Sequence, residues 1–152
     1  MSAYFTKDVV VAGGIPPQQL VATATITSGQ VDLWSYGSAF FDFLAGLLGG
    51  TSPTLSAVLQ VQESSDGISW TNNATIPPYT LVGSASAEKQ ATLEVLALQL
   101  GSGKRYARLQ ATCTIGGTTP TVPIACASYG YNPVPRPTTG LADSSVVSQT
   151  AV

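Results

Sequence analysis

The run Tyr106-Ala-Arg-Leu-Gln-Ala-Thr-Cys-Thr-Ile115, the segment Gly116-Gly117-Thr118-Thr119-Pro120 and the run Thr121 to Tyr129 decide the fold class. In both runs, apolar or small side chains alternate with polar ones, which is typical of half-buried β-strands. The segment between them has the glycine and proline content of a turn. We therefore predict a long antiparallel hairpin. The side chains predicted to face inward are Ala107, Leu109, Ala111, Cys113 and Ile115 in the first run and Val122, Ile124 and Cys126 in the second.

The same turn sequence occurs a second time. Gly49-Gly50-Thr51-Ser52-Pro53-Thr54 matches Gly116 to Thr121 at five of six positions. It joins the apolar residues 38–48 to the alternating residues 54–63, so we predict a second long hairpin. Two similar hairpins facing each other form an antiparallel β-sandwich, and about eight strands in this arrangement resemble a jelly roll. We therefore predict an all-β, jelly-roll-like sandwich.

The remaining segments set the predicted boundaries. Residues 1–19 contain two glycines and two prolines and predict an N-terminal extended arm, and the proline-rich residues 131–152 predict a C-terminal extended tail. The sandwich domain is then expected over residues 20–130. Ser64 to Gly67 predicts a turn followed by a short strand over residues 68–71. Residues 91–99 favour a strand, with a helix as the alternative.

Composition narrows the function. Charged residues make up 9% of the chain, against about 25% in typical domains, which suits a surface buried against other protein. A neutral but fully solvated surface is the alternative interpretation. A net charge of −2 argues against nucleic-acid binding. No run approaches the ~18 apolar residues of a membrane-spanning helix, and residues 1–8 do not resemble a signal peptide. We therefore expect synthesis and first assembly in a cytoplasm.

No recognised catalytic pattern is present. The chain has no histidine, the commonest general base and metal ligand, and its acids, Glu63 among them, are scattered singly. We therefore predict no enzymatic activity, no cofactor and no metal site. If Cys113 and Cys126 are diagonal neighbours in the predicted hairpin, they lie ~7–8 Å apart, too far for an unstrained disulfide. We expect two buried free thiols.

A resemblance adds to this interpretation. The order of Leu59 to Trp70, Gly103 to Arg108 and the Gly-Gly-Thr-Thr-Pro segment resembles small structural proteins encoded among the head genes of tailed bacteriophages. The resemblance covers roughly residues 20–130. It implies a capsid decoration (cement) protein that binds the major capsid protein on the virion surface, with a homotrimer favoured. The chain departs from this pattern in the apolar run Phe40 to Leu48, which could be core or interface, and in its long C-terminal tail.

The predicted partner contacts follow from the arms and from the one basic cluster, for which a solvated strand end is the alternative. A tail, baseplate or connector component is the second candidate function. A carbohydrate-binding module with Trp34 or Trp70 stacked on a sugar is the third, although for Trp70 inward packing is favoured. The predicted contact residues are Tyr4, Phe5, Val9, Val10, Val11, Lys104, Tyr106, Arg108, Val134, Pro135, Arg136 and Pro137.

Overall fold

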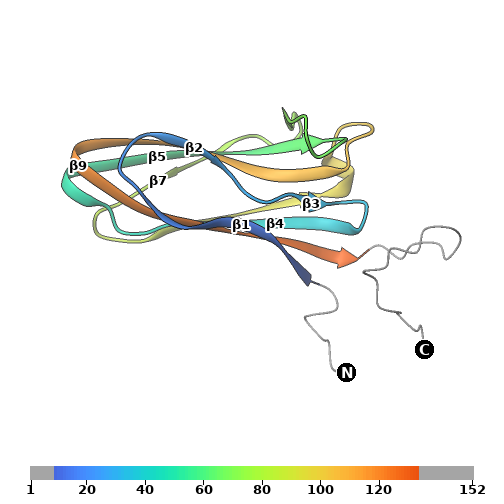
Figure 1. The fold of residues 1–152 in the computed structure, drawn as a ribbon, viewed down its shortest axis with the longest axis horizontal. Coiled ribbons are helices and arrows are strands. Elements are labelled where there is room, and N and C mark those ends of the chain that lie inside the picture. Colours follow the sequence, from blue (N-terminus) through green and yellow to red (C-terminus); the bar gives the residue numbers. More distant parts are fainter. Residues whose placement is uncertain (1–8, 134–152) are drawn as a thin grey trace, which may run out of the picture.

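The computed structural model describes residues 9–133. Apart from one short 3₁₀ turn, η1 (Ala97–Gln99), every regular element in this range is a β-strand. Figure 1 shows an elongated molecule with its strands running along the long axis. The strands are β1 (Val9–Leu20), β2 (Ala24–Thr27), β3 (Val31–Asp32), β4 (Tyr36–Ala45), β5 (Gly49–Ser64), β6 (Thr71–Asn72), β7 (Tyr79–Val82), β8 (Lys89–Leu96) and β9 (Tyr106–Pro133).

The strands form two antiparallel layers. In sheet A the order is β1, the C-terminal half of β9, β4 and β8. In sheet B the order is β2 with β3, the N-terminal half of β9, β5, and then β6 with β7. The chain crosses from one layer to the other after β1, β3, β4, β7 and β8, and again within β9, which lies inside both sheets. The strand order is therefore that of a jelly roll. The predicted all-β, jelly-roll-like antiparallel sandwich is confirmed.

The two predicted hairpins are wrong. β9 is one strand of 28 residues; its residues 106–116 pair with β5, and its residues 124–133 pair with β4. The two alternating runs therefore lie in different sheets and do not pair with each other. Residues 116–121 bend a single strand from one sheet to the other, and residues 49–54 do the same at the start of β5.

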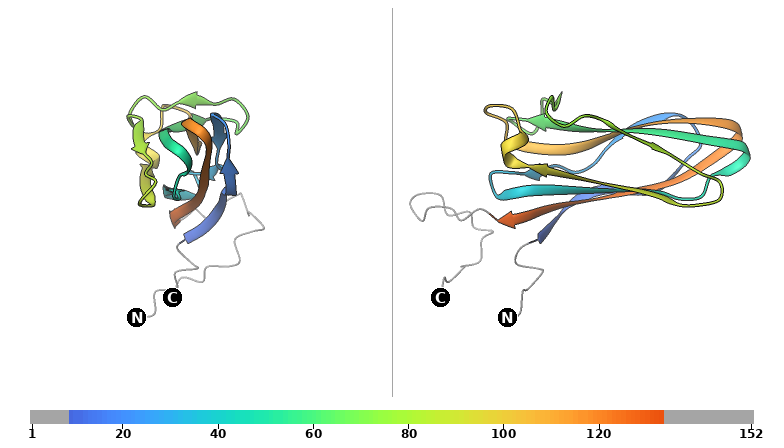
Figure 2. Two further views of the ribbon diagram at one scale, coloured as in Figure 1. Left: turned by 90° about the vertical axis from the view of Figure 1, so that its left-hand side faces the viewer. Right: turned by 180° about the vertical axis from the view of Figure 1, so that it is seen from behind.

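The two repeated motifs pair with each other. Gly49 lies opposite Thr121, Thr51 opposite Thr118, and Thr54 opposite Gly116, with a register shift on each side of Thr51. Figure 2 (right) shows β5 and β9 curving side by side at one end of the molecule. This feature, residues 49–54 paired with residues 116–121, is termed the double bend. It is nearly symmetric, because Gly50 and Gly117 have φ values of 108° and 109°, and Ser52 and Thr119 have values of 51° and 49°.

The double bend explains the burial pattern of β9. Before the bend the odd-numbered side chains from Ala107 to Cys113 are buried, whereas after it the even-numbered ones from Val122 onward are buried. The register shifts at the bend change which side chains face inward. The inward positions predicted from sequence are thus confirmed for both runs, except that Ile115 is half-buried.

The apolar run Phe40 to Leu48 belongs to both core and surface. Ala39, Phe41 and Phe43 of β4 are fully buried, whereas Leu44 and Leu47 are 40% and 50% exposed. One face of β4 therefore fills the core, Leu44 lies on its outer face, and Leu47 lies beyond the end of β4 at Ala45.

Three segments refine the predicted boundaries. Residues 9–19 of the predicted N-terminal arm belong to β1, which pairs with β9, and the ordered strand at the other end continues to Pro133. Residues 91–96 form a strand, as favoured, and residues 97–99 form η1. Of the strand predicted over residues 68–71, only Thr71 lies in a strand, β6 (Thr71–Asn72). Ile68 and Ser69 instead belong to a turn, because their N–H groups donate to the Asp66 carboxylate.

The double bend predicts a large effect of two glycine substitutions. A Cβ atom on Gly50 would lie 2.6 Å from the Thr119 carbonyl oxygen, and one on Gly117 would lie 2.7 Å from that of Ser52. We expect Gly50→Ala and Gly117→Ala each to lower the free energy of unfolding by more than about 3 kcal/mol in denaturant titrations.

Gly103→Ala is the matched control. Gly103 also has a positive φ, 75°, but no atom lies within 4 Å of the position that a Cβ atom would take there, so this variant should lose only about 1 kcal/mol. Equal losses for all three variants would mean that close packing of the double bend is unimportant.

The cysteines allow a second prediction. Cys113 lies in sheet B and Cys126 in sheet A, both buried and free, so the expected free thiols are confirmed for a different reason from the predicted one. Burial raises the pKa of each thiol to about 11. We expect no reaction with a thiol reagent at pH 8 in the native protein and two titratable thiols in denaturant. Fewer than two would indicate a disulfide.

Candidate functional site

Aromatic and basic side chains gather at the end of the sandwich opposite the double bend. Asp32 of β3 and Ser64 of β5 both lie opposite Tyr106, and Tyr36 lies opposite Pro133. The Leu33 N–H donates to the Arg105 carbonyl across this end (2.9 Å). The surface is termed the aromatic end and consists of Trp34, Tyr36, Trp70, Lys104, Arg105, Tyr106, Arg108 and Tyr131.

Arg105 is fixed between two aromatic rings. Its Nε donates to Oδ1 of Asp32 (2.9 Å), and its Nη2 donates to Oδ2 of the same carboxylate. Its guanidinium carbon lies 4.9 Å from the ring centroid of Trp34 and 4.9 Å from that of Tyr106. A bidentate ion pair and two cation–π contacts hold this side chain in one orientation.

Asp32 is the anchor of this arrangement. Besides the Arg105 hydrogen bonds, it accepts from the Trp34 N–H (3.0 Å) and from the Ser35 hydroxyl (3.1 Å). Partial burial raises the pKa of Asp32, but the hydrogen bonds from Arg105, Trp34 and Ser35 and the Arg105 charge together lower it below its ordinary value.

Arg108 forms a second stack. Its guanidinium carbon lies 4.2 Å from the Trp70 ring centroid, and its Nε donates to Oε1 of Gln62 (2.9 Å). The Trp70 ring is half-buried, and its packing partner is Arg108 rather than the hydrophobic core, so the inward packing favoured from sequence is not found. Trp34, in contrast, is 61% exposed.

A buried polar network supports the loops of this end. Asn73 Nδ2 donates to Oε2 of Glu63 (2.6 Å) and to the Gln99 carbonyl (2.9 Å). The Gly101 N–H donates to the same Glu63 oxygen (2.9 Å), and Asn73 Oδ1 caps the N–H groups of residues 75 and 76. The network joins the end of β5 to the loops on either side, and no spacing in the sequence links these residues.

The predicted turn at Ser64 to Gly67 is confirmed. Asp66 Oδ1 accepts hydrogen bonds from the N–H groups of Ile68 and Ser69 (both 2.8 Å) and from the Ser64 hydroxyl (2.8 Å). These hydrogen bonds hold the pKa of Asp66 well below its usual range.

The structure brings several of the predicted contact residues to the same end. Tyr106, Lys104 and Arg108 are half-buried members of the aromatic end, and half-buried Val9 lies opposite Tyr131. Val10 and Val11 are exposed on β1. Sequence reasoning missed Arg105 and Tyr131 as site residues. Six predicted contacts lie outside the described residues: Tyr4, Phe5, Val134, Pro135, Arg136 and Pro137.

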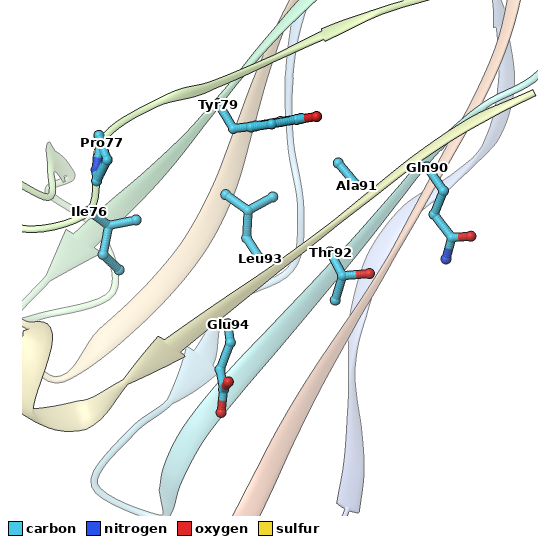
Figure 3. A pocket seen from close by; sticks show the side chains of 8 residues that line it. All are labelled: Ile76, Pro77, Tyr79, Gln90, Ala91, Thr92, Leu93 and Glu94. Carbon is cyan, nitrogen blue, oxygen red and sulfur yellow. The ribbon is translucent and has the colours of Figure 1, made fainter.

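A shallow groove of about 470 Å³ lies between β7 and β8. Figure 3 shows Leu93 pointing toward Tyr79 and Ile76, whereas Thr92 and Glu94 point away to the other side of β8. Gln90 and Thr92 both donate to Oδ1 of Asp42 on β4 (2.6 and 3.0 Å). The groove is lined by Ile76, Pro77, Tyr79, Gln90, Ala91, Thr92, Leu93 and Glu94.

Two kinds of site are not found between residues 9 and 133. No cluster of three His, Cys, Asp or Glu residues there is placed to hold a metal ion. No helix in the same range is long and apolar enough to cross a membrane.

Comparisons with known proteins give similarity in structure only. No family model matches this chain. No curated protein sequence matches it. Among solved structures, one described as "CBM4 structure and function" is 12% identical, covers 72% of this chain and 61% of its own, and has a TM-score of 0.43.

Two viral structures are similar at the same level. A structure of the infectious bursal disease virus Gx strain has a chain that is 12% identical in sequence to this one. The match covers 81% of this chain and 31% of the viral chain, with a TM-score of 0.43. Desmodium yellow mottle tymovirus is 10% identical over 86% of this chain and 91% of its own, with a TM-score of 0.39. This chain spans less than two thirds of the CBM4 and bursal disease virus chains. Likenesses this low carry no argument about function, and the fold assignment rests on strand pairing.

The Asp32–Arg105 pair predicts a pH dependence. Because the pKa of Asp32 is lower in the folded chain than its ordinary value of 3.8, the pair stabilises the fold above that pH and is lost as pH falls through the folded pKa. We expect Asp32→Asn to lower the free energy of unfolding by about 1 kcal/mol at pH 7. The difference from the wild type should shrink below about pH 4 in denaturant titrations; a constant difference from neutral pH down to about pH 2 would contradict the assignment.

Proposed function

We propose that this chain is a non-enzymatic virion structural protein that binds the outside of a phage capsid and stabilises it. The observation that carries the proposal is the aromatic end. It collects exposed Trp34 and Tyr131 and half-buried basic side chains beside Val9 and Pro133, the first and last described residues. In the sequence, the predicted contact residues Tyr4 and Phe5 precede Val9, and Val134 to Pro137 follow Pro133.

The chemistry of the aromatic end suits adhesion to protein. Trp, Tyr and Arg contribute most of the binding energy at protein interfaces, and Trp34 and Tyr131 are 61% and 43% exposed. The Arg105 stack is already ordered by Asp32, so little side-chain entropy is lost on binding. Tyr131 is likewise held by an edge-to-face contact with Phe40, at a centroid distance of 5.8 Å.

The proposed partner is the major capsid protein, and the proposed assembly on the shell is a homotrimer. Repetition of one binding mode over a lattice requires a rigid contact surface more than a chemical site. The low charge of the chain agrees with this role, because few charges need to be desolvated when such a surface is covered.

A carbohydrate-binding module is the second candidate function. The exposed ring of Trp34 is the observation that favours it, since aromatic rings can stack on sugar faces. Arg105 already lies over this ring, and Arg108 lies over Trp70. Both tryptophans therefore have partners in the chain itself, and capsid adhesion is preferred.

Substitution of Trp34 tests the proposal. Trp34→Ala removes an exposed ring at the aromatic end, and we expect it to weaken binding to purified shells lacking this protein by roughly 30-fold or more, the effect of losing an interface hot spot of about 2 kcal/mol. Binding is measured by sedimentation of shells with increasing protein concentration.

Leu47→Ala is the matched control, because Leu47 is also apolar and 50% exposed but lies near the double bend. It should bind like the wild type. Wild-type binding by Trp34→Ala would exclude the aromatic end as the contact surface. Binding of wild-type protein to glycans but not to shells would favour the second candidate.

A further inference from the structure

Three of the four lateral edges of the sandwich carry features that discourage further strand pairing. The β1 edge of sheet A is interrupted by two register shifts and by Pro16 and Pro17. The edges of sheet B are short, with four and two residues in β2 and β3, and two and four in β6 and β7. Bulges, prolines and short strands are the usual means of blocking edge-to-edge association.

The β8 edge has none of these features. β8 has eight residues, contains no proline or glycine, and pairs with β4 without a register shift. Leu96 shows which backbone groups face outward, because its N–H donates to Oε1 of Gln99 (2.8 Å) and not to β4. Backbone groups alternate in direction along an antiparallel strand, so those of Gln90, Thr92 and Glu94 also face outward. In the described part of the chain, β4 is the only strand that pairs with β8.

An apolar groove runs along this edge. Ala91 and Leu93 line it from β8, and Ile76 and Tyr79 line it from the other side. Figure 3 shows Leu93 pointing toward Tyr79 and Ile76, and Tyr79 is 53% exposed. A strand added to β8 would place every second side chain over this groove. Apolar burial and backbone hydrogen bonding therefore favour the same kind of occupant, an extended strand.

We propose that a second copy of this chain pairs with this edge, β8 against β8, in an antiparallel two-fold dimer centred on Thr92. In such a contact the strand faces itself, so its own sequence must be self-complementary. Centring on Thr92 places Thr92 opposite its counterpart and Gln90 opposite Glu94 of the second copy. These are the residues whose N–H and C=O groups face outward, so each pair can exchange two backbone hydrogen bonds.

The sizes and polarities of the side chains agree with this register. On the groove face, Ala91 lies opposite Leu93 of the second copy, so a small side chain faces a large one. The apolar linings of the two grooves, Tyr79 included, then meet across the two-fold axis and are withdrawn from water together. On the outer face, threonine opposite threonine and glutamine opposite glutamate are pairs that can form hydrogen bonds.

Charge favours this register over its neighbours. A two-fold axis one residue earlier would place Glu88 opposite Glu94, and one a residue later would make the two Glu94 side chains diagonal neighbours. Like charges directly opposite each other are destabilising, and diagonal neighbours are still within reach of long side chains. With the axis at Thr92, Glu94 faces an uncharged glutamine, and Lys89 lies one residue away from Glu94 along the facing strand. The charges of β8 are thus complementary to those of a second β8.

The inferred dimer leaves the aromatic ends free. Ser38 lies opposite both Leu96 and Tyr131, so the Leu96 end of β8 is the end nearest the aromatic end. Because the two β8 strands run in opposite directions, the aromatic ends of the two copies lie at opposite ends of the dimer. The two-fold contact is additional to the contacts of the proposed homotrimer on the shell and does not depend on them.

Sedimentation equilibrium of the isolated full-length protein over a range of concentrations tests the inference. We expect a reversible dimer, and we expect Thr92→Pro to weaken it at least about 10-fold, because this variant lacks the N–H that pairs at the two-fold axis. Proline is tolerated on an edge strand where the N–H faces away from the sheet, so the monomer should keep its fold. Thr92→Val, which loses the same hydroxyl but keeps the N–H, is the matched control and should dimerise nearly as well as the wild type.

Cross-linking tests the register. Opposite residues of a hydrogen-bonded pair have Cα atoms about 5.5 Å apart, which is within the range of a disulfide. Thr92→Cys should therefore give a covalent dimer under mild oxidation. Thr80→Cys, at an exposed position of β7, is the control and should give little, and the native Cys113 and Cys126 are buried.

Two results in sedimentation would overturn the inference: a monomer at every concentration, and a dimer that Thr92→Pro leaves unchanged. If circular dichroism shows that Thr92→Pro does not fold, the cross-linking result decides. Absence of a covalent dimer of Thr92→Cys, or equal cross-linking at positions 80 and 92, would overturn the inference.

Discussion

The pairing of two bent strands is the constraint on which the rest of this structure depends. At the double bend, β5 and β9 pass between the sheets side by side, each through a glycine with a φ value near 108°. Each glycine lies against the backbone carbonyl groups of the opposite motif, so neither strand can bend there without the other. The bends fix the register of both sheets and determine which side chains of β9 enter the core.

The same constraint separates the molecule into two chemically different ends. The double-bend end is built from glycine, threonine, serine and proline, whereas the opposite end carries both tryptophans and the lysine and arginine residues of the aromatic end. Because β9 runs through both sheets, it places Tyr106 at its start and Tyr131 near its finish at this same end. The polar network around Glu63 and Asn73 then holds the intervening loops.

Local pattern predicted the strands but not how they connect. Alternation correctly predicted a strand over residues 54–63, and it correctly placed the odd-numbered side chains from Ala107 to Cys113 inward, because a period of two is a property of one strand. The Gly-Gly-Thr-Ser/Thr-Pro motif was predicted to be a hairpin turn, which is wrong, because each copy instead carries the chain from one sheet to the other. Whether such a motif makes a hairpin or carries a strand into another sheet depends on its distant partner, which is the other copy of the motif. For the same reason Arg105, whose partner Asp32 is 73 residues away, could not be recognised as a site residue from local sequence.

The copy number of this chain in purified phage particles, relative to the major shell protein, tests the central claim most directly. It can be measured by quantitative mass spectrometry of intact, extensively washed particles. A capsid-stabilising protein bound over the lattice predicts about one copy per shell subunit or one per few subunits. A handful of copies per particle would instead indicate a tail or connector component, and absence from particles would contradict the virion assignment.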